Sequence, residues 1–351
     1  MNNNITLSIC IATLNRAAFI GETLNSIISQ VTEEVEIVIV DGASTDNTEE
    51  IVKNHQQKFP RLRYYRLAVK GGVDQDYCRA VELARGKYCW LFTDDDILKP
   101  GAIQTVLSAM QHDYELILVN AEVRDVTLSR VLEDRCLHFM NNMTYQTRDF
   151  ERFFVDVAAY LSFIGCVVIK RSLWNEREKK QYFGTVFVHV GVIFQKPFNG
   201  NITVLVEPLI SIRYGNALWT SKSFEISLFK WPDLIWSFPL FSESAKRQVC
   251  KREPWRGVKA LLICRARGVF SLKEYRMLME PHLLSNMKRF FIQAIAQFPG
   301  FLLNSGLIIY FSIFRNFYSK PSIVLDDLKN SRFYYKNYMN YKSKKKEAIC
   351  I

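Results

Sequence analysis

The N-terminal third of the chain alternates between short apolar runs rich in β-branched residues and longer segments with apolar residues at helical spacing. Residues 5–13 (ITLSICIAT) predict a buried strand, and residues 17–31 (AAFIGETLNSIISQV) predict an amphipathic helix. The alternation continues with strands predicted at 35–44, 62–68 and 87–94. Strands that alternate with helices predict an α/β fold built on a mostly parallel, doubly wound sheet.

The charge of the chain is distributed unevenly. Residues 1–200 carry 22 Lys+Arg against 25 Asp+Glu, whereas residues 201–351 carry 24 against 10. A basic second part predicts an anionic partner, which is either nucleic acid or the cytoplasmic leaflet of a membrane. No recognised nucleic-acid motif accompanies the positive charge, so the membrane surface is favoured.

Cysteine usage and the N-terminus predict a cytosolic location. The eight cysteines form no CxxC pair and lie mostly inside apolar runs, as reduced core residues do. The first ten residues (MNNNITLSIC) lack the basic and apolar regions of a secretory signal.

Three consecutive aspartates follow the fourth predicted strand, in WLFTDDDILK (residues 90–99). Adjacent carboxylates repel one another, and Mg²⁺ and Mn²⁺ are the cations that proteins commonly bind through one or two carboxylates together with a substrate diphosphate. A solvated acidic turn is the alternative, because Asp also favours turns. Ligands of doubly wound sheets bind at the carboxyl ends of the strands, where this run lies.

Three stretches together resemble the N-terminal half of family 2 glycosyltransferases with the GT-A fold: ATLNR (12–16), VDGASTDNT (40–48) and GGVDQDYCRAVELARGKYCWLFTDDD (71–96). The resemblance covers about residues 5–108. Within that family, the sequence of these stretches is most similar to bacterial O-antigen abequosyltransferases, which implies a CDP-activated 3,6-dideoxyhexose as donor. The resemblance therefore implies a nucleotide-sugar-dependent glycosyltransferase that uses Mg²⁺ or Mn²⁺.

The resemblance assigns roles to individual positions around the donor. It implies that the nucleotide is bound by Thr13, Asn15, Arg16, Asp41, Asp94 and Arg213, and we add Asp76 to the expected nucleotide-binding residues. Asp76 departs from the family pattern, and we expect its carboxylate to hydrogen-bond the sugar or the amine of the base. Turn formation or surface acidity remains the alternative for Asp41 and Asp76.

The metal ligands and the catalytic group are expected from the acidic run and from a later apolar segment. The alignment implies that Asp95 binds the metal, with Thr93 standing where the family commonly has its first aspartate, and Asp96 is a second candidate ligand or catalytic group. The segment 182–194 (YFGTVFVHVGVIF) contains no acid, so His189 is the candidate base or third ligand. A core histidine is the alternative, and the anomeric outcome stays open.

We expect the acceptor and the sugar to contact four further residues. They are Ser162, Gly165, Asn216 and Trp219. Tryptophan suits a sugar face because its ring is large and apolar, although packing alone also explains it.

The expected organisation is a GT-A domain over residues 1–222, with a nucleotide-binding half (1–110) and an acceptor half (111–222), followed by a helical, basic region at 223–351. Basic residues flank the apolar run 298–314, which suits an interfacial segment. The expected function is transfer of a sugar such as abequose to a lipid-linked oligosaccharide, by a protein peripheral on the inner face of the cell membrane. A nucleotidyltransferase is the alternative, but it needs a glycine-rich phosphate loop that ATLNRAAFIG does not supply.

Overall fold

The computed structural model describes residues 5–216, 222–314 and 321–337 of the chain. The chain folds into two compact units. The first comprises Met1–Arg213 together with Ser237–Val249, and the second comprises Tyr214–Trp236 together with Cys250–Ile351.

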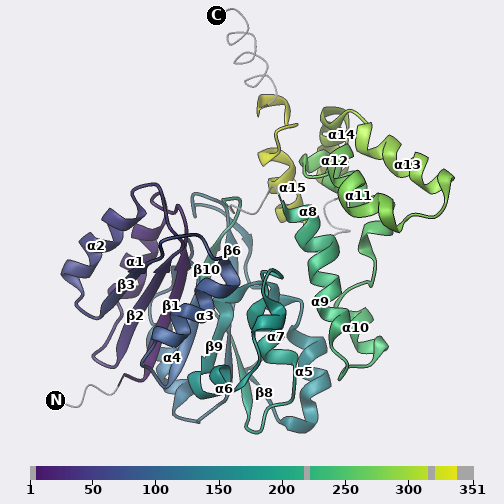
Figure 1. Cartoon of the computed structure of the whole chain (residues 1–351). Coiled ribbons are helices and arrows are strands. Elements are labelled where there is room, and N and C mark those ends of the chain that lie inside the picture. The colour runs from purple at the N-terminus through teal and green to yellow at the C-terminus, as the bar shows by residue number, and fades with distance from the viewer. Residues whose placement is uncertain (1–4, 217–221, 315–320, 338–351) are drawn as a thin grey trace, which may run out of the picture. The chain divides into compact units, whose positions relative to one another are not determined.

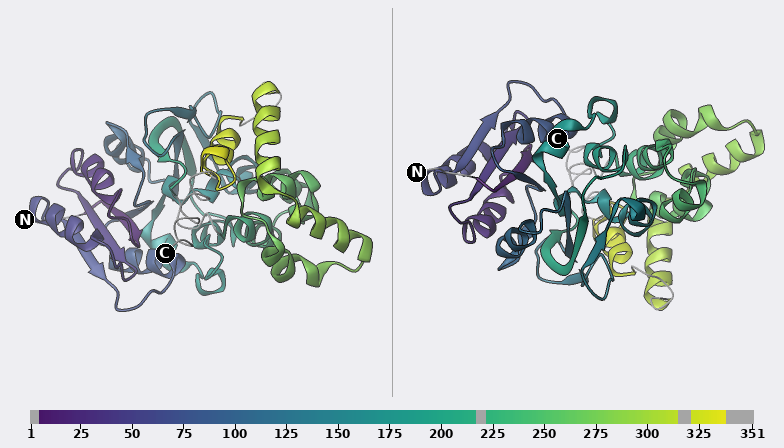
Figure 2. Two further views of the ribbon diagram at one scale, coloured as in Figure 1. Left: turned by 90° about the horizontal axis from the view of Figure 1, so that it is seen from above. Right: turned by 90° about the horizontal axis from the view of Figure 1, so that it is seen from below.

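The first unit is built on a sheet with helices on both of its sides (Figure 1, Figure 2). Its N-terminal part alternates strands and helices in the order predicted from the sequence. These elements are β1 (Leu7–Thr13), α1 (Ile20–Ile28), β2 (Val35–Asp41), α2 (Thr48–Lys58), β3 (Leu62–Arg66), α3 (Val73–Leu83) and β4 (Tyr88–Phe92). Every residue of β1, β2 and β4 is buried, which explains why these strands appear in the sequence as continuous apolar runs.

The sheet continues beyond β4 with strands of both directions. The remaining elements of the first unit are β5 (Ile97–Leu98), α4 (Ala102–Met110), β6 (Leu116–Arg124), β7 (Val131–Glu133), β8 (Met143–Tyr145), α5 (Phe150–Val157), β9 (Val167–Lys170), α6 (Arg171–Glu176), α7 (Val188–Phe194), β10 (Ile202–Arg213) and α10 (Glu243–Val249). The strand order is β3-β2-β1-β4-β9-β6-β10-β5. Strands β1 to β4 pair in parallel, as do β6 and β10, whereas β9 is antiparallel to both of its neighbours. The mostly parallel α/β sheet expected from the sequence is confirmed.

The parallel register brings the predicted motif residues to one edge of the sheet. Thr13 pairs with Asp41 at the last position of the β1–β2 ladder, and the acidic run follows the end of β4, which is the other neighbour of β1. The sheet therefore places all three motif segments at the carboxyl ends of adjacent strands.

Aromatic side chains from distant parts of the sequence form a cluster inside the first unit. The ring of Phe154 in α5 stacks on that of Phe241, with 3.9 Å between the ring centroids, and Phe194 of α7 packs edge-on against both. Phe238 joins the same cluster. These contacts explain why residues 237–249 belong to the first unit although α9 separates them from it in sequence.

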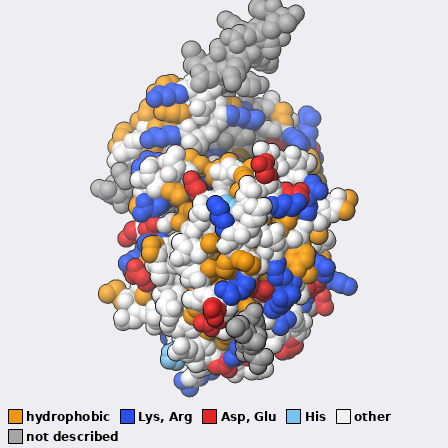
Figure 3. All heavy atoms as spheres, turned by 90° about the vertical axis from the view of Figure 1, so that its left-hand side faces the viewer, with side chains coloured by type: hydrophobic (Ala, Val, Ile, Leu, Met, Phe, Trp, Pro, Cys, Tyr) orange, Lys and Arg blue, Asp and Glu red, His pale blue; other side chains and the backbone are white. Residues whose placement is uncertain are grey.

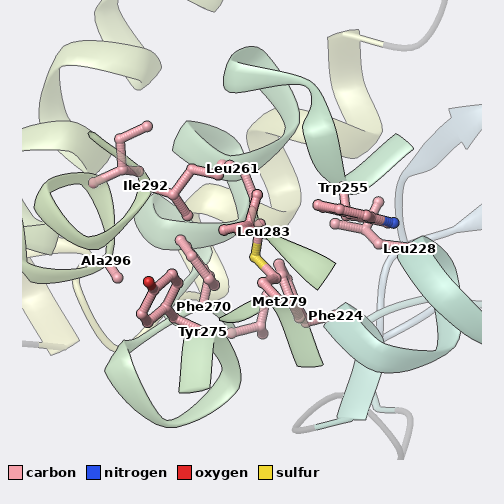
Figure 4. Packing of buried hydrophobic residues seen from close by; sticks show 12 residues of the cluster. Phe224, Leu228, Trp255, Leu261, Phe270, Tyr275, Met279, Leu283, Ile292 and Ala296 are labelled. Atoms are coloured by element: carbon pink, nitrogen blue, oxygen red, sulfur yellow. The ribbon is translucent and has the colours of Figure 1, made fainter. Parts of the chain in front are cut away.

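The second unit is helical and has its own hydrophobic core (Figure 4). Its helices are α8 (Ser223–Glu225), α9 (Trp231–Ser237, whose last residue is counted with the first unit), α11 (Val258–Arg267), α12 (Leu272–Glu274), α13 (Asn286–Gln297), α14 (Gly300–Ile313) and α15 (Pro321–Asn330). Phe224 stacks on Phe270 at 4.8 Å between ring centroids, and Tyr275 and Met279 complete the centre of this core. The mainly helical C-terminal region expected from the sequence is confirmed.

No single helix in the described ranges is long and apolar enough to cross a membrane. Helices α13 and α14 reach the required length and apolarity only when taken together, and they are bent by 84° at the break between them. On the face of the molecule drawn in Figure 3, Lys and Arg side chains lie interspersed with Asp and Glu.

Candidate active site

Two loops are joined at the carboxyl ends of β1 and β2. The backbone N–H of Asn15 donates to the hydroxyl of Ser44 at 2.9 Å, and the amide oxygen of Asn15 accepts from the N–H of Thr45 at 2.7 Å. Asn15 has a φ of 54°, a left-handed conformation that asparagine tolerates better than most residues. Thr13 is buried immediately before this loop. The predicted nucleotide-pocket residues therefore form one connected edge.

Arg16 connects this edge to the acidic run. Its Nε lies 3.2 Å from Oδ1 of Asp94, and one of its terminal nitrogens lies 3.3 Å from Oδ2 of Asp95. All three side chains are about nine-tenths buried. One guanidinium thus faces two adjacent carboxylates in a setting where charges are weakly screened.

The acidic run carries more negative charge than Arg16 balances. Burial, and then the charge of Asp95, raise the pKa of Asp94 to about 7, although Arg16 opposes the shift. The same two causes raise the pKa of Asp96 well above its usual range. Raised carboxylate pKa values at a buried edge show that a further cation would be stabilised there.

Asp96 has a different environment from its two neighbours. Its Oδ1 accepts a hydrogen bond from the backbone N–H of Arg213 at 2.7 Å, and its Oδ2 accepts from the hydroxyl of Thr93. Both oxygens are therefore engaged by the protein, whereas Asp94 and Asp95 face Arg16. The roles of Asp96 as metal ligand and catalytic group stay predictions.

Arg213, which is expected to bind the nucleotide, braces the acidic run in this structure. Its Nε donates to the carbonyl oxygen of Asp95 at 2.9 Å, and one terminal nitrogen donates to the carbonyl oxygen of Val126 at 2.9 Å. The other terminal nitrogen pairs with Glu22 of α1. Each guanidinium nitrogen therefore has a protein partner in this structure, and these contacts position the aspartates. The role of Arg213 in nucleotide binding stays a prediction.

Asp41 and Asp76 form a second acidic pair at the same sheet edge. Asp41 is fully buried, with Oδ1 accepting from the N–H of Ser44 at 2.7 Å and Oδ2 from the hydroxyl of Tyr64 at 2.6 Å. Asp76 is 5 % exposed, and its Oδ1 has no hydrogen-bond partner among the described residues. Burial and then the charge of Asp41 raise the pKa of Asp76 to about 6, with Lys70 opposing. A buried acceptor oxygen is therefore available at this position.

His189 lies in α7 and is 1 % exposed. Its Nε2 lies 2.7 Å from the carbonyl oxygen of Leu161, which fixes the proton on Nε2 because a carbonyl oxygen only accepts. Burial lowers the pKa of the ring to about 4, so the imidazole is neutral at pH 7. These contacts are those of a core histidine, and its metal-binding and catalytic roles stay predictions.

The loop before His189 is held by an acid from the N-terminal half of the first unit. Asp74, at the start of α3, accepts hydrogen bonds from three backbone N–H groups: Gly184 at 2.8 Å, Val186 at 3.0 Å and Val188 at 3.1 Å. Val186 has a φ of 67°, which is strained for a β-branched residue. Asp74 therefore connects the nucleotide-binding half to the predicted acceptor half.

The four predicted acceptor residues have different environments. Ser162 is exposed and donates to the carbonyl of Ala159, whereas Gly165 is buried and its carbonyl accepts from the Trp90 indole at 2.8 Å. A Cβ at Gly165 would meet the Phe163 ring at 2.3 Å, so a larger residue there would displace that ring. Asn216 falls in the second unit, and Trp219 lies outside the described residues.

The acidic run supplies carboxylate oxygens, which are the ligands that a divalent cation such as Mg²⁺ or Mn²⁺ prefers. Within the described ranges, no three His, Cys, Asp or Glu side chains converge as a complete metal site. Mg²⁺ and Mn²⁺ sites commonly use only one or two protein carboxylates, with substrate phosphate and water completing the shell. Asp94 and Asp95 supply two adjacent buried carboxylates with excess negative charge, which meets that requirement.

The sequence of residues 8–165 matches the profile described as Glycosyl transferase family 2. Among curated proteins, the chain is 28% identical over 232 residues to abequosyltransferase RfbV of Salmonella typhimurium, an alignment that spans 62% of this chain and 69% of that protein.

Two solved structures resemble the whole chain in fold. S. aureus TarS 1–349 in complex with UDP superposes with a TM-score of 0.56 at 15% identity, covering 95% of this chain and 92% of that one. Mannosyltransferase PcManGT from Pyrobaculum calidifontis, in complex with GDP-Man and Mn²⁺, gives a TM-score of 0.51 at 15% identity, covering 94% and 88%. The motif residues at the sheet edge, the profile match and the shared fold agree, and residues 8–165 of this chain are a family 2 glycosyltransferase domain of the GT-A fold.

Proposed function

We propose that this chain is a metal-dependent glycosyltransferase that moves a 3,6-dideoxyhexose such as abequose from a CDP-sugar to a lipid-linked oligosaccharide in O-antigen or surface polysaccharide synthesis. The observation that carries the proposal is the buried pair of Asp94 and Asp95, which shares Arg16 at the sheet edge beside Asp41. Arg16 balances only one of the two carboxylates, and a further buried charge is costly unless a cation binds it, which favours a functional site over a solvated turn.

Mg²⁺ or Mn²⁺ would be held by Asp95, together with Asp94 or Asp96. When bound, such an ion neutralises the charge that develops on a departing diphosphate. The protein's own contribution is to keep the carboxylates in place: the side chain of Arg213 donates to the carbonyl oxygen of Asp95, and the backbone N–H of Arg213 donates to the carboxylate of Asp96. We assign Arg16 to the phosphates or ribose of the donor, because its guanidinium lies beside the proposed metal ligands Asp94 and Asp95.

We assign the nucleoside to the edge formed by Thr13, Asn15 and Asp41, with Asp76 facing the base. A cytosine carries an exocyclic amine that donates hydrogen bonds, and the buried Oδ1 of Asp76 is an acceptor without a protein partner among the described residues. A uracil presents an acceptor oxygen where cytosine has its amine. The acidity of Asp76 therefore supports a CDP-linked donor over a UDP-linked one.

Replacing Asp76 with Asn is expected to stabilise the ligand-free protein and weaken its binding of CDP. Because the pKa of Asp76 is raised from 3.8 to about 6, its ionised form costs stability above pH 6. The gain at pH 7 should be about 1–2 kcal/mol, since one pKa unit corresponds to about 1.4 kcal/mol and solvent screens part of the cost. The gain should shrink as the pH falls from 6 and vanish below about 4, where both states are protonated. Denaturant unfolding across this pH range measures it.

Binding of CDP and UDP to Asp76→Asn tests whether the site recognises cytosine or uracil. CDP affinity should fall about fivefold to tenfold, because an amide oxygen is a weaker acceptor than a carboxylate. UDP affinity should fall less or rise, since uracil has an acceptor oxygen in place of the cytosine amine and the new amide of Asn can donate to it. Parallel changes for CDP and UDP in calorimetry would remove Asp76 from base recognition.

We place the enzyme at the inner face of the cell membrane as a peripheral protein, where a lipid-linked acceptor is presented. The basic charge of residues 201–351 and the exposed apolar side chains of the second unit support this location. Ser162, Gly165, Asn216 and Trp219 remain the proposed contacts to acceptor and sugar. A nucleotidyltransferase is not favoured, because the loop after β1 is not glycine-rich.

A thermal-shift screen of CDP, UDP, GDP and dTDP with and without Mn²⁺ tests the proposal. CDP with Mn²⁺ should raise the melting temperature most, since a ligand at one hundred times its Kd adds about 2.7 kcal/mol of stability. If another nucleotide stabilises the protein more than CDP does, the proposed glycosyltransferase activity stands and the donor carries that nucleotide instead. If none of the four nucleotides raises the melting temperature, the donor-site assignment is wrong.

A further inference from the structure

Helix α13 exposes large apolar side chains to solvent. Met287 is 80% exposed, Phe290 73% and Phe291 54%. These residues have the three- and four-residue spacing that puts them on one side of the helix, while Ile292 and Ile295 point into the core of the second unit. The helix therefore has an apolar side that nothing in the described part of its unit covers.

Helix α14 also exposes large apolar side chains to solvent. The helix contains no charged residue, and its exposed side carries Leu302, Ile309 and Ile313, which are 52%, 60% and 68% exposed. Its polar Asn304 is instead fully buried, where Nδ2 donates to the carbonyl oxygens of Ala266 and Leu328. The rest of the inner side is apolar, with Phe311 buried in the hydrophobic cluster, so α14 is apolar on nearly every side. A helix that is apolar on its exposed side as well, and carries no charge, suits contact with an apolar medium.

Isolated apolar residues on a protein surface are common, but a continuous run of them marks an interaction site. We define the α13–α14 surface by its exposed apolar residues: Leu284, Met287, Phe290, Phe291, Phe298, Phe301, Leu302, Ile309, Tyr310, Ile313 and Phe314. This surface belongs entirely to the second unit.

The charge around this surface selects the kind of partner. Helix α13 carries Lys288 and Arg289 and no acid, and the sequence contains no Asp or Glu between Glu280 and Asp326. Cations beside exposed aromatic and aliphatic side chains suit the headgroup region of an anionic bilayer. The 84° bend between α13 and α14 suits a pair that lies within one leaflet, because neither helix is long enough to cross.

We propose that the α13–α14 surface inserts into one leaflet of an anionic membrane and is the chain's main membrane contact. This inference rests on the peripheral location in the proposed function and deepens it, because it names the surface and makes apolar insertion, rather than attraction to charge, the dominant contribution. Arg315 and Lys320, which also flank the apolar run, lie outside the described residues.

The test uses sedimentation of the full chain with vesicles of phosphatidylglycerol alone and of phosphatidylcholine alone. Two double variants remove apolar side chains from the surface: Phe290→Ser with Phe291→Ser, and Ile309→Ser with Ile313→Ser. The matched control is Met140→Ser with Leu240→Ser, since these residues of the first unit are 92% and 50% exposed. Thermal unfolding checks that each variant folds, as exposed side chains contribute little to the core.

The wild-type protein and the control should sediment with phosphatidylglycerol vesicles, and high salt should weaken this binding without abolishing it, because screening removes only the electrostatic part. Each surface variant should bind at least about tenfold more weakly, since it removes two apolar side chains from the inserted surface. All variants should keep nucleotide binding in the thermal-shift screen.

Three results would overturn the inference. The wild-type protein stays in the supernatant with phosphatidylglycerol vesicles at low salt, or both surface variants bind as tightly as the control, or light scattering shows a dimer that the surface variants dissociate while vesicle binding is absent. In the last case the surface binds a second copy of the chain. Failure of the proposed function is distinct, because it appears as vesicle binding without stabilisation by any nucleotide.

Discussion

Asp95→Asn is expected to lower the rate of sugar transfer about a thousandfold or more while leaving the protein folded. The substitution removes one negative ligand from the proposed metal site and changes little in shape. A metal ion contributes several kcal/mol to stabilising a leaving group's charge, and each 1.4 kcal/mol is a factor of ten in rate. Turnover with CDP-sugar at saturating Mn²⁺ measures the effect.

The fold should tolerate this change because Asp95 is repelled by its neighbours. Its charge raises the pKa of both Asp94 and Asp96, so its removal relieves a buried repulsion. The brace from Arg213 ends on the backbone carbonyl of Asp95 and is kept in the variant. We therefore expect an unchanged or higher melting temperature.

Asp134→Asn is the matched control, because it neutralises an exposed carboxylate of the same unit. It should keep full activity. If Asp95→Asn transfers sugar at the wild-type rate with the wild-type dependence on metal, Asp95 is not a ligand and the acidic run needs another explanation.

The fold of the first 110 residues could be predicted from sequence because buried parallel strands appear there as continuous apolar runs. Residues 35–44 were expected to be a strand, and β2 covers Val35–Asp41, all of it buried. Parallel pairing then brings Thr13 beside Asp41 without further information. Local pattern and topology were sufficient for this part.

The sequence could not predict in the same way that residues 237–249 pack with the first unit. Phe238 and Phe241 look like ordinary apolar residues of a helical region, and their partner Phe154 lies more than eighty positions away. Contacts over such separations leave no periodicity in the sequence, so only the three-dimensional structure shows them.

Motif residues at the candidate site were found, but their supporting contacts were not. The acidic run itself pointed to Asp94 and Asp95 as site residues. The sequence does not show which groups contact the guanidinium of Arg213, which are Asp95, Val126 and Glu22. An arginine that binds phosphate and one that braces a loop look alike in a sequence. The partners that distinguish them come from other elements of the fold.

Asp74 is a second residue whose contacts appear only in the structure, and Asp74→Ala is expected to lower the free energy of unfolding by about 3–5 kcal/mol. Each hydrogen bond to a charged group contributes about 1.5–3 kcal/mol, and Asp74 accepts three from backbone N–H groups. Water recovers part of the loss, because Gly184 is exposed, whereas Val188 is buried at the start of α7. Denaturant unfolding at pH 7 measures the change.

The loss should be accompanied by a change confined to residues 184–188. Val186 keeps its left-handed φ of 67° only while its N–H is held, since that conformation costs a β-branched residue about 1–3 kcal/mol. Hydrogen exchange should therefore speed up at the amides of Gly184, Val186 and Val188, while nucleotide binding persists because Arg16 and Asp41 are held by other contacts.

The stability of Asp74→Asn should fall between that of the wild type and that of Asp74→Ala. The amide oxygen of Asn can accept from Gly184 and Val186, but its NH₂ group would face the N–H of Val188. Gln75→Ala, at the exposed neighbouring position, should behave as wild type. If Asp74→Ala unfolds at the wild-type denaturant concentration with unchanged exchange in this loop, the carboxylate does not anchor it and the link between the two halves lies elsewhere.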